Sequence, residues 1–132
     1  MKLKKLSIIL GVVIGLSLLN CKQSTAQQST LLEPQEFKEF VSANEVLLVD
    51  IRTPREFNSG HIEKAININF LSSEFDEQIQ KLDTTKTLVI YCRSGNRSSK
   101  STSKFVKVGF DNLYDLKGGV LNWQKSGLKL VK

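Results

Sequence analysis

A cysteine lies in a short polar run that follows an apolar, strand-like stretch and opens a helix-like one. The run extends from Tyr91 to Ser99 and contains Cys92, with Arg93 and Arg97 close by. A thiol at a helix N-terminus faces unpaired backbone N–H groups and the positive end of the helix dipole, and both stabilise a thiolate. The run therefore predicts an enzyme with a cysteine nucleophile.

The residues that follow the cysteine allow the backbone to curl around one point. Ser94 and Gly95 are small or flexible, and Asn96 tolerates left-handed geometry, so several N–H groups can converge on a sulfur atom or an anion. Arg93 and Arg97 add fixed positive charge, and an arginine can donate two parallel hydrogen bonds to an oxyanion. We predict that these five residues bind an anionic substrate.

The segments around this loop alternate between strand and helix. Continuous apolar runs at 46–49 and 87–91 predict strands that are buried on both faces, and shorter strands are expected at 65–68 and 112–116. Helical patterns occupy 34–41, 54–59, 72–82, 98–108 and 120–125. This alternation predicts an α/β fold, an open and mostly parallel sheet with helices on both faces. Such folds place their sites at the carboxyl ends of strands.

Three further polar residues are expected to support the site. Asp50 and Arg52 follow the strand at 46–49, and an acid and a base two residues apart more often fix loops through a buried network than bind substrate. Direct substrate contact by this pair stays an open alternative. Ser98, at the start of the helix after the cysteine, is likewise predicted to support the site.

The single histidine and the single tryptophan are not assigned to the chemistry. His61 lies in a glycine-containing turn, and we expect it to hold its neighbours by hydrogen bonds rather than to pair with Cys92. Trp123 is expected in the core. No cluster of residues has metal-ligand spacing, and neither a metal nor a cofactor is expected.

The first 26 residues have the composition of an export signal. A basic start, Met1 to Lys5, precedes fourteen residues that are apolar apart from two serines, which is too short a run to span a bilayer comfortably. Two processing routes stay open: cleavage after Ala26, or lipid attachment at Cys21, since residues 18–21 resemble the bacterial lipobox. Either route predicts an exported protein of the periplasm or cell envelope, soluble or tethered to the membrane through Cys21.

After the signal, a polar segment at 27–31 is expected to be a flexible tether before one domain over 32–132. The formal net charge of +6 falls to +2 from Gln27 onward, where 15 basic residues face 13 acidic ones. That balance is too weak to predict a nucleic-acid partner. We expect a monomer with small-molecule partners, in which Cys92 is the remaining thiol after cleavage at Ala26.

Well beyond the loop, the sequence resembles the single-domain rhodaneses, a family of thiosulfate-type sulfurtransferases. The resemblance covers roughly residues 32–132 in family order. It rests on Val49–Arg52, Glu56-Phe57, Gly60–Ile62, Ala65–Ile68, Gly109-Phe110, Leu113–Leu116, Gly118-Gly119, Trp123 and Gly127. One departure is Glu63-Lys64, where the family often has proline and glycine in a turn.

The resemblance implies a rhodanese-like fold and makes Cys92 the sulfur acceptor that becomes a persulfide, with Arg93–Arg97 as its cradle. A donor such as thiosulfate would deliver sulfane sulfur to the thiolate, and cyanide or a thiol would then take it, in two covalent steps. Backbone donors and the arginines would stabilise the anionic sulfur in both steps.

Two alternatives remain on the same fold. A non-catalytic rhodanese-like module would carry sulfur or dock a partner, but such a module would typically have lost the cysteine or the loop, and both are intact here. Related phosphatases and arsenate reductases have five residues between cysteine and arginine. Four residues separate Cys92 from Arg97, and the tighter loop favours sulfur over phosphate.

Overall fold

The computed structural model describes residues 29–132, in which strands and helices alternate. The strands are β1 (Thr30–Leu32), β2 (Val46–Asp50), β3 (Ile66–Asn67), β4 (Thr87–Tyr91) and β5 (Leu113–Leu116). The helices are α1 (Pro34–Ala43), α2 (Pro54–Ser59), α3 (Phe75–Gln80), α4 (Asn96–Val108) and α5 (Gly119–Lys125). The predicted export signal and the lipidation alternative at Cys21 lie outside the described residues.

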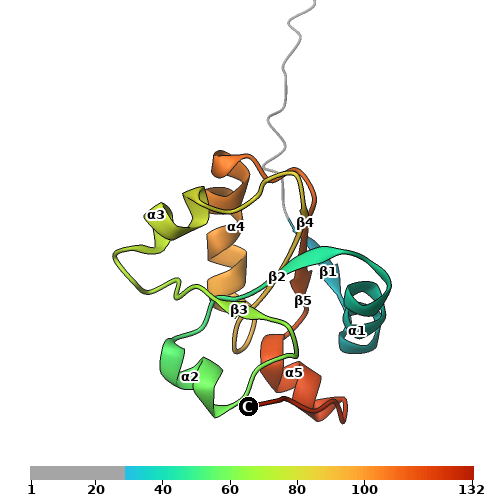
Figure 1. Ribbon diagram of the computed structural model, residues 1–132. Helices are drawn as coiled ribbons and strands as arrows, with labels where there is room; N and C mark the ends of the chain where they lie inside the picture. Colours follow the sequence, from blue (N-terminus) through green and yellow to red (C-terminus); the bar gives the residue numbers. More distant parts are fainter. Residues whose placement is uncertain (1–28) are drawn as a thin grey trace, which may run out of the picture.

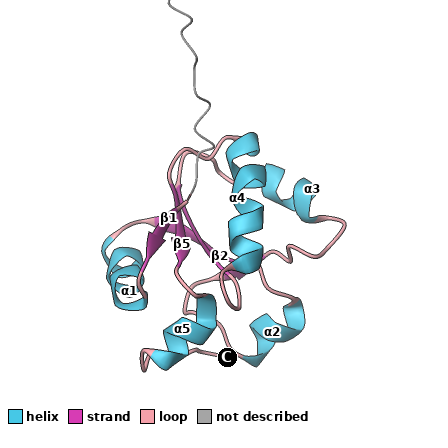
Figure 2. Ribbon diagram, turned by 180° about the vertical axis from the view of Figure 1, so that it is seen from behind, coloured by secondary structure: helices cyan, strands magenta, loops and turns pink. Residues whose placement is uncertain are grey.

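The strands form one sheet in the order β1-β5-β4-β2-β3, and every pairing in it is parallel. Helices α3 and α4 lie on one face, and α1 and α5 lie on the other (Figure 1 and, from behind, Figure 2). The predicted α/β fold with helices on both faces is thus confirmed. The chain runs outward from β2 to β3 and then returns to β4, so the order reverses between β2 and β4, where such folds place their sites.

Alternation of side chains along β4 divides the core into two clusters, one on each face of the sheet. Ile90 and Cys92 belong to the cluster under α4, whereas Val89 and Tyr91 belong to the cluster under α1 and α5. Aromatic rings close both clusters, among them Phe75 and Phe105 on the first face and Phe37 and Trp123 on the second. The cysteine is therefore anchored in the core on the α4 side.

The first strand corrects one sequence expectation. Thr30 and Leu31, predicted as the end of a flexible tether at 27–31, belong to β1 and pair in parallel register with β5. The carbonyl of Leu32 also accepts a hydrogen bond of 2.9 Å from Lys117 N–H. An edge strand gains these bonds from its partner, and the composition of three residues does not reveal them. The folded domain therefore includes Thr30 and Leu31.

Helix α2 covers the predicted range 54–59 and begins with a reciprocal cap. Thr53 Oγ1 accepts a hydrogen bond from Glu56 N–H at 3.3 Å, Glu56 Oε2 accepts one from Thr53 N–H at 3.0 Å, and Pro54 occupies the first turn. This reciprocal cap fixes Glu56 at the entrance of the helix. Among the described helices, none is long and apolar enough to cross a membrane.

The boundaries of several helices differ from the sequence expectation, among them those of α3 and α4. Helix α4 begins two residues earlier than predicted, because Gly95 takes a left-handed conformation, with φ of 98°, and serves as its N-cap. Helix α3 is shorter than the predicted 72–82 and covers only Phe75–Gln80. The earlier start of α4 brings its first turn closer to Cys92.

Candidate active site

Cys92 lies just beyond β4, where the chain turns into α4. Its Sγ accepts hydrogen bonds from the backbone N–H of Gly95 at 3.1 Å and of Ser98 at 3.4 Å, and Ser98 Oγ lies 3.5 Å away. The positive φ of Gly95 allows the tight curl that aims its N–H at the sulfur. These donors stabilise negative charge on a sulfur that is almost fully buried, since Cys92 is 1% exposed.

The first turn of α5 holds the cysteine loop from outside. Val120 N–H donates to the carbonyl of Cys92 at 3.0 Å, and Leu121 N–H donates to the carbonyl of Arg93 at 3.1 Å. Gly119 makes this approach feasible, because a Cβ there would lie 2.5 Å from both carbonyl oxygens. The sequence analysis noted Gly118-Gly119 only as part of the family resemblance and did not connect it to the loop.

Arg97 points to a carboxylate that the sequence analysis did not place at the site. Its two terminal nitrogens donate to the two oxygens of Glu56, at 2.8 and 2.7 Å, and the side chains are 19% and 28% exposed. The hydrogen bond from Arg97 is the main cause that lowers the pKa of Glu56 to about 2. The cap observed at the start of α2 fixes Glu56 there, but nothing in the sequence indicated that Glu56 faces α4.

The other predicted anion-binding side chains of the loop lie at the surface. Arg93, Ser94 and Asn96 are exposed. Within residues 29–132 no acidic group forms an ion pair with Arg93. Its guanidinium is therefore the unshared positive charge of the loop, in contrast to the guanidinium of Arg97.

Asp50 and Arg52 form a buried ion pair at the end of β2. Arg52 Nη2 lies 2.6 Å from Asp50 Oδ2 and also donates to the carbonyl of Gly60 at 2.7 Å. Asn67 Nδ2 donates to the backbone carbonyls of both residues, and the guanidinium lies 5.7 Å from the centre of the Tyr91 ring. The network joins β2, the turn after α2 and β3, which fits the supporting role predicted for the pair.

His61 lies in the turn between α2 and β3, where its side chain holds neighbouring residues. Its Nδ1 lies 3.1 Å from the carbonyl of Phe57, and its ring stacks on the Phe57 ring with centroids 3.9 Å apart. Its backbone pairs with Val131 near the end of the chain. The predicted turn role is confirmed. In the described part of the chain, no group of three histidines, cysteines or acidic residues is placed to hold a metal ion.

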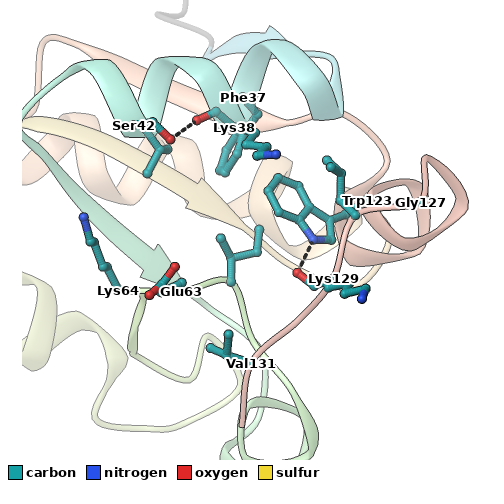
Figure 3. A pocket seen from close by; sticks show the side chains of 12 residues that line it. Phe37, Lys38, Ser42, Glu63, Lys64, Trp123, Gly127, Lys129 and Val131 are labelled. Carbon is teal, nitrogen blue, oxygen red and sulfur yellow. Dashed lines mark hydrogen bonds between the residues drawn. The ribbon is translucent and has the colours of Figure 1, made fainter.

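Trp123 is buried, as predicted, and packs edge-on against Phe37. It also forms part of a pocket between α1 and α5, where its Nε1–H donates to the carbonyl of Lys129 at 3.0 Å (Figure 3). None of the residues that line this pocket belongs to the cysteine loop. The pocket is therefore separate from the candidate active site.

A buried carboxyl beside α4 was missed by the sequence analysis. Asp115, in β5, is 1% exposed, and its Oδ1 has no hydrogen-bond partner among the described residues. Burial raises the pKa of Asp115 to about 7, while hydrogen bonds from Ser98 and from Leu116 N–H act in the opposite direction. A charged residue inside an otherwise apolar strand was the available signal.

Comparison with known proteins places this geometry in a family. The family model described as rhodanese-like domain matches residues 33–126. A tRNA uridine(34) hydroxylase of Pelagibacter ubique is 32% identical over 116 residues, which cover 87% of this chain and 37% of that protein. An uncharacterized protein of Synechocystis is 33% identical over 109 residues, 83% of this chain and 60% of its own length. The chain spans less than two thirds of either relative.

Solved structures agree with the sequence comparisons. A rhodanese-related protein from Thermoplasma volcanium superposes with a TM-score of 0.65 at 28% identity, covering 77% of this chain and 97% of that one. The protein SSP1007 from Staphylococcus saprophyticus gives a TM-score of 0.66 at 26% identity, covering 78% and 99%. The family match runs from the N-cap of α1 to the C-cap of α5 and includes the cysteine loop. The chain belongs to the rhodanese-like domain family.

Proposed function

We propose that the protein is a sulfurtransferase that carries sulfane sulfur on Cys92 as a persulfide. The observation that supports this most directly is the position of Sγ, which accepts two backbone N–H bonds from a curled loop at the start of α4. A sulfur held in this way is stabilised as an anion, both as the attacking thiolate and as the leaving thiolate. The four-residue spacing to Arg97 favours sulfur over a tetrahedral oxyanion.

The proposed reaction has two balanced steps. The Cys92 thiolate attacks the outer sulfur of a donor such as thiosulfate, so that a new S–S bond forms and sulfite leaves with the electron pair of the broken one. Cyanide or a thiolate then attacks the terminal sulfur of the persulfide, and Cys92 departs again as a thiolate. The N–H groups of Gly95 and Ser98 stabilise the negative charge at both ends of the cycle.

The charges around the loop divide the proposed binding roles. Arg93 is exposed, and among residues 29–132 it is not held by any acidic group, so we assign its guanidinium to the donor anion. Arg97 is shared with Glu56, and it contributes less net positive charge than an unpaired arginine. We assign no substrate contact to Asp50 and Arg52, which hold the end of β2 and the turn after α2 together.

Mass spectrometry of the full chain tests the proposal. After incubation with thiosulfate we expect a mass increase of one sulfur on the peptide that contains Cys92, and thiocyanate after addition of cyanide. Cys92→Ser should abolish both signals, whereas the matched variant Cys21→Ser should keep them. Absence of both the adduct and the thiocyanate in the unaltered protein would overturn the proposal.

The same assays separate the alternatives. A sulfur-carrier or docking module would take up sulfur without turning over, or would take up none. A phosphatase would hydrolyse p-nitrophenyl phosphate and form no persulfide. The hydroxylase activity in the name of the Pelagibacter relative is not assigned to this chain, because the match covers 37% of that protein.

We also propose that the protein is exported to the periplasm or cell envelope. The support is the basic and apolar composition of the first 26 residues. Mass measurement of the mature N-terminus from cells distinguishes the two processing routes. A terminus at Gln27 indicates cleavage, a lipid-modified Cys21 indicates a tether, and an intact Met1 contradicts export.

A further inference from the structure

The carboxyl of Asp115 lies on the same side of the sheet as Cys92, on the neighbouring strand. Strands β4 and β5 are paired, with Asp115 opposite Ile90 in the register. Leu113, Ile90 and Cys92 all belong to the cluster under α4. Because side chains alternate along a strand, Asp115 points to the same face as Leu113. Two chemically active side chains thus lie under the first turns of one helix.

Ser98 stands between these two groups. Of the polar groups bonded to Cys92 Sγ among the described residues, the N–H groups of Gly95 and Ser98 can only donate, whereas Ser98 Oγ, at 3.5 Å, can accept the thiol proton. The Ser98 hydroxyl donates to the carbonyl of Gly95 at 3.1 Å. Ser98 also lies close enough to Asp115 for its side chain to lower the pKa of that carboxyl. One rotatable hydroxyl can therefore serve either acceptor.

Burial restricts other routes for the proton. Cys92 and Asp115 are each 1% exposed, so little of either side chain is in direct contact with bulk water. Asp115 Oδ1 has no partner within residues 29–132. An unpartnered buried oxygen is costly, and it leaves the Asp115 carboxyl with unused capacity to accept a proton.

The charges near Asp115 do not compete for this role. In the pocket that Asp115 lines, α4 contributes the hydroxyl-bearing Ser99, Thr102 and Ser103. Lys117, after β5, lines the same pocket, but its ammonium is paired with Glu33. Arg97, at the start of α4, is paired with Glu56.

We propose that Asp115 is a positioning residue that receives the Cys92 proton through Ser98 and so forms the thiolate; this inference rests on the proposed sulfurtransferase function. The Cys92 S–H proton moves to Ser98 Oγ while the Ser98 O–H proton moves to Asp115. The thiol and the carboxylate become a thiolate and a carboxylic acid, with no change of oxidation state.

The protonation of Asp115 determines the pH range in which the relay works. Only the carboxylate can accept a proton, and the pKa of Asp115 is raised to about 7. Below that pH the carboxyl is already protonated and the relay is blocked. The relay therefore becomes active as the pH rises through about 7.

Alkylation of Cys92 by iodoacetamide, followed on the Cys92 peptide by mass spectrometry, tests the relay in the full chain. We expect the alkylation rate to show an inflection near pH 7, at the pKa of Asp115. Asp115→Asn should lose this inflection and react roughly tenfold more slowly above it, a smaller loss than direct removal of a general base. Ser98→Ala should behave in the same way, and the double variant should add nothing further.

A matched control distinguishes a proton relay from a structural role. Thr102→Val removes a hydroxyl from the same pocket wall, where Thr102 Oγ1 donates to the carbonyl of Ser98, and should keep the inflection. The relay is wrong if Asp115→Asn keeps the inflection of the unaltered protein, or if Thr102→Val loses it equally. Alkylation needs no sulfur donor, so an intact inflection without any persulfide would contradict only the sulfurtransferase function.

Discussion

Asp50 and Asp115 are two aspartates buried to almost the same extent, 0% and 1% exposed, at the same end of one sheet. Asp50 meets the guanidinium of Arg52 through several hydrogen bonds and also accepts a bond of 2.9 Å from Arg52 N–H. Asp115 has no ion pair among the described residues and keeps one oxygen free. The two carboxyls are thus equally buried, but within residues 29–132 only that of Asp50 has a positively charged partner.

The difference shows that partners, not burial, determine what a buried carboxyl can do. A carboxylate held by an arginine stays charged and ties segments together, so its removal leaves an opposite charge buried and unpaired. A carboxyl without a cation titrates near neutrality, because burial opposes its ionisation. The first type stabilises the loops around the site, and the second is available for proton transfer.

The largest effect is expected at the paired carboxyl. Asp50→Asn leaves Arg52 buried without a counter-charge and should lower the free energy of unfolding by about 3–5 kcal/mol. Urea unfolding measures this loss. As a control, the exposed Asp83→Asn should change stability far less, because its carboxyl is in contact with solvent. A loss at Asp50 as small as that of the control would remove the distinction between the two buried aspartates.

At the unpaired carboxyl, the expected change has the opposite sign and depends on pH. The raised pKa means that the folded protein loses stability as the pH rises from the ordinary value of 3.8 to about 7, and the loss persists above that. Asp115→Asn removes this titration and should stabilise the fold by about 4 kcal/mol above pH 7, with little effect below pH 3.8. Thermal unfolding across this range checks it, and a pH-independent difference would contradict the assignment.

Glu56 provides an intermediate case, a half-buried carboxylate paired with Arg97. Its lowered pKa means that it contributes stability above the ordinary value of 4.5, and that this contribution is lost as the pH falls to about 2. We expect a loss of about 1.5 kcal/mol over that window, reduced by solvent screening, and expect it to be absent in Glu56→Gln. Acid unfolding of the unaltered protein and of Glu56→Gln, each monitored by circular dichroism, measures this loss. Identical unfolding curves for the two proteins would contradict a stabilising role of the ion pair.

The smallest expected effect concerns the exposed arginine. Arg93→Ala should raise the KM for thiosulfate about fivefold, roughly 1 kcal/mol, because one unshared charge is lost from the proposed anion site. The melting temperature should stay unchanged, since the side chain is exposed. Steady-state kinetics with Lys100→Ala, an exposed cation on α4, serves as the comparison. An equal rise in KM for both variants would indicate only a general charge effect.

Local signals predicted the elements around the site well. The apolar run at 87–91 corresponds to β4, and α2 occupies the predicted range 54–59. Hydrophobic periodicity and capping are properties of neighbouring residues, so they can be read from the chain before it folds. The edge strand β1 was missed, because its hydrogen bonds come from β5.

Contacts between distant residues account for what the sequence analysis did not find. Arg97 and Glu56 are 41 residues apart, and only the tertiary structure brings the first turns of α2 and α4 close enough for them to pair. Gly119 follows β5 in the chain and contacts the cysteine loop. A glycine is required there because the backbone carbonyls of the loop approach its Cα closely, which the sequence does not show.

The sequence by itself determined the cysteine, its loop and the alternation of strands and helices, because residue type and local spacing specify them. Only the tertiary structure decided which charges are free. It paired Arg97 with Glu56 and left Asp115 without a cation, since ion pairs and the cost of burial depend on distances between segments far apart in the chain. Because of these distances, Arg97, which was predicted to bind an anion, shares its charge with Glu56. For the same reason Asp115, which the sequence analysis did not notice, is a candidate proton acceptor.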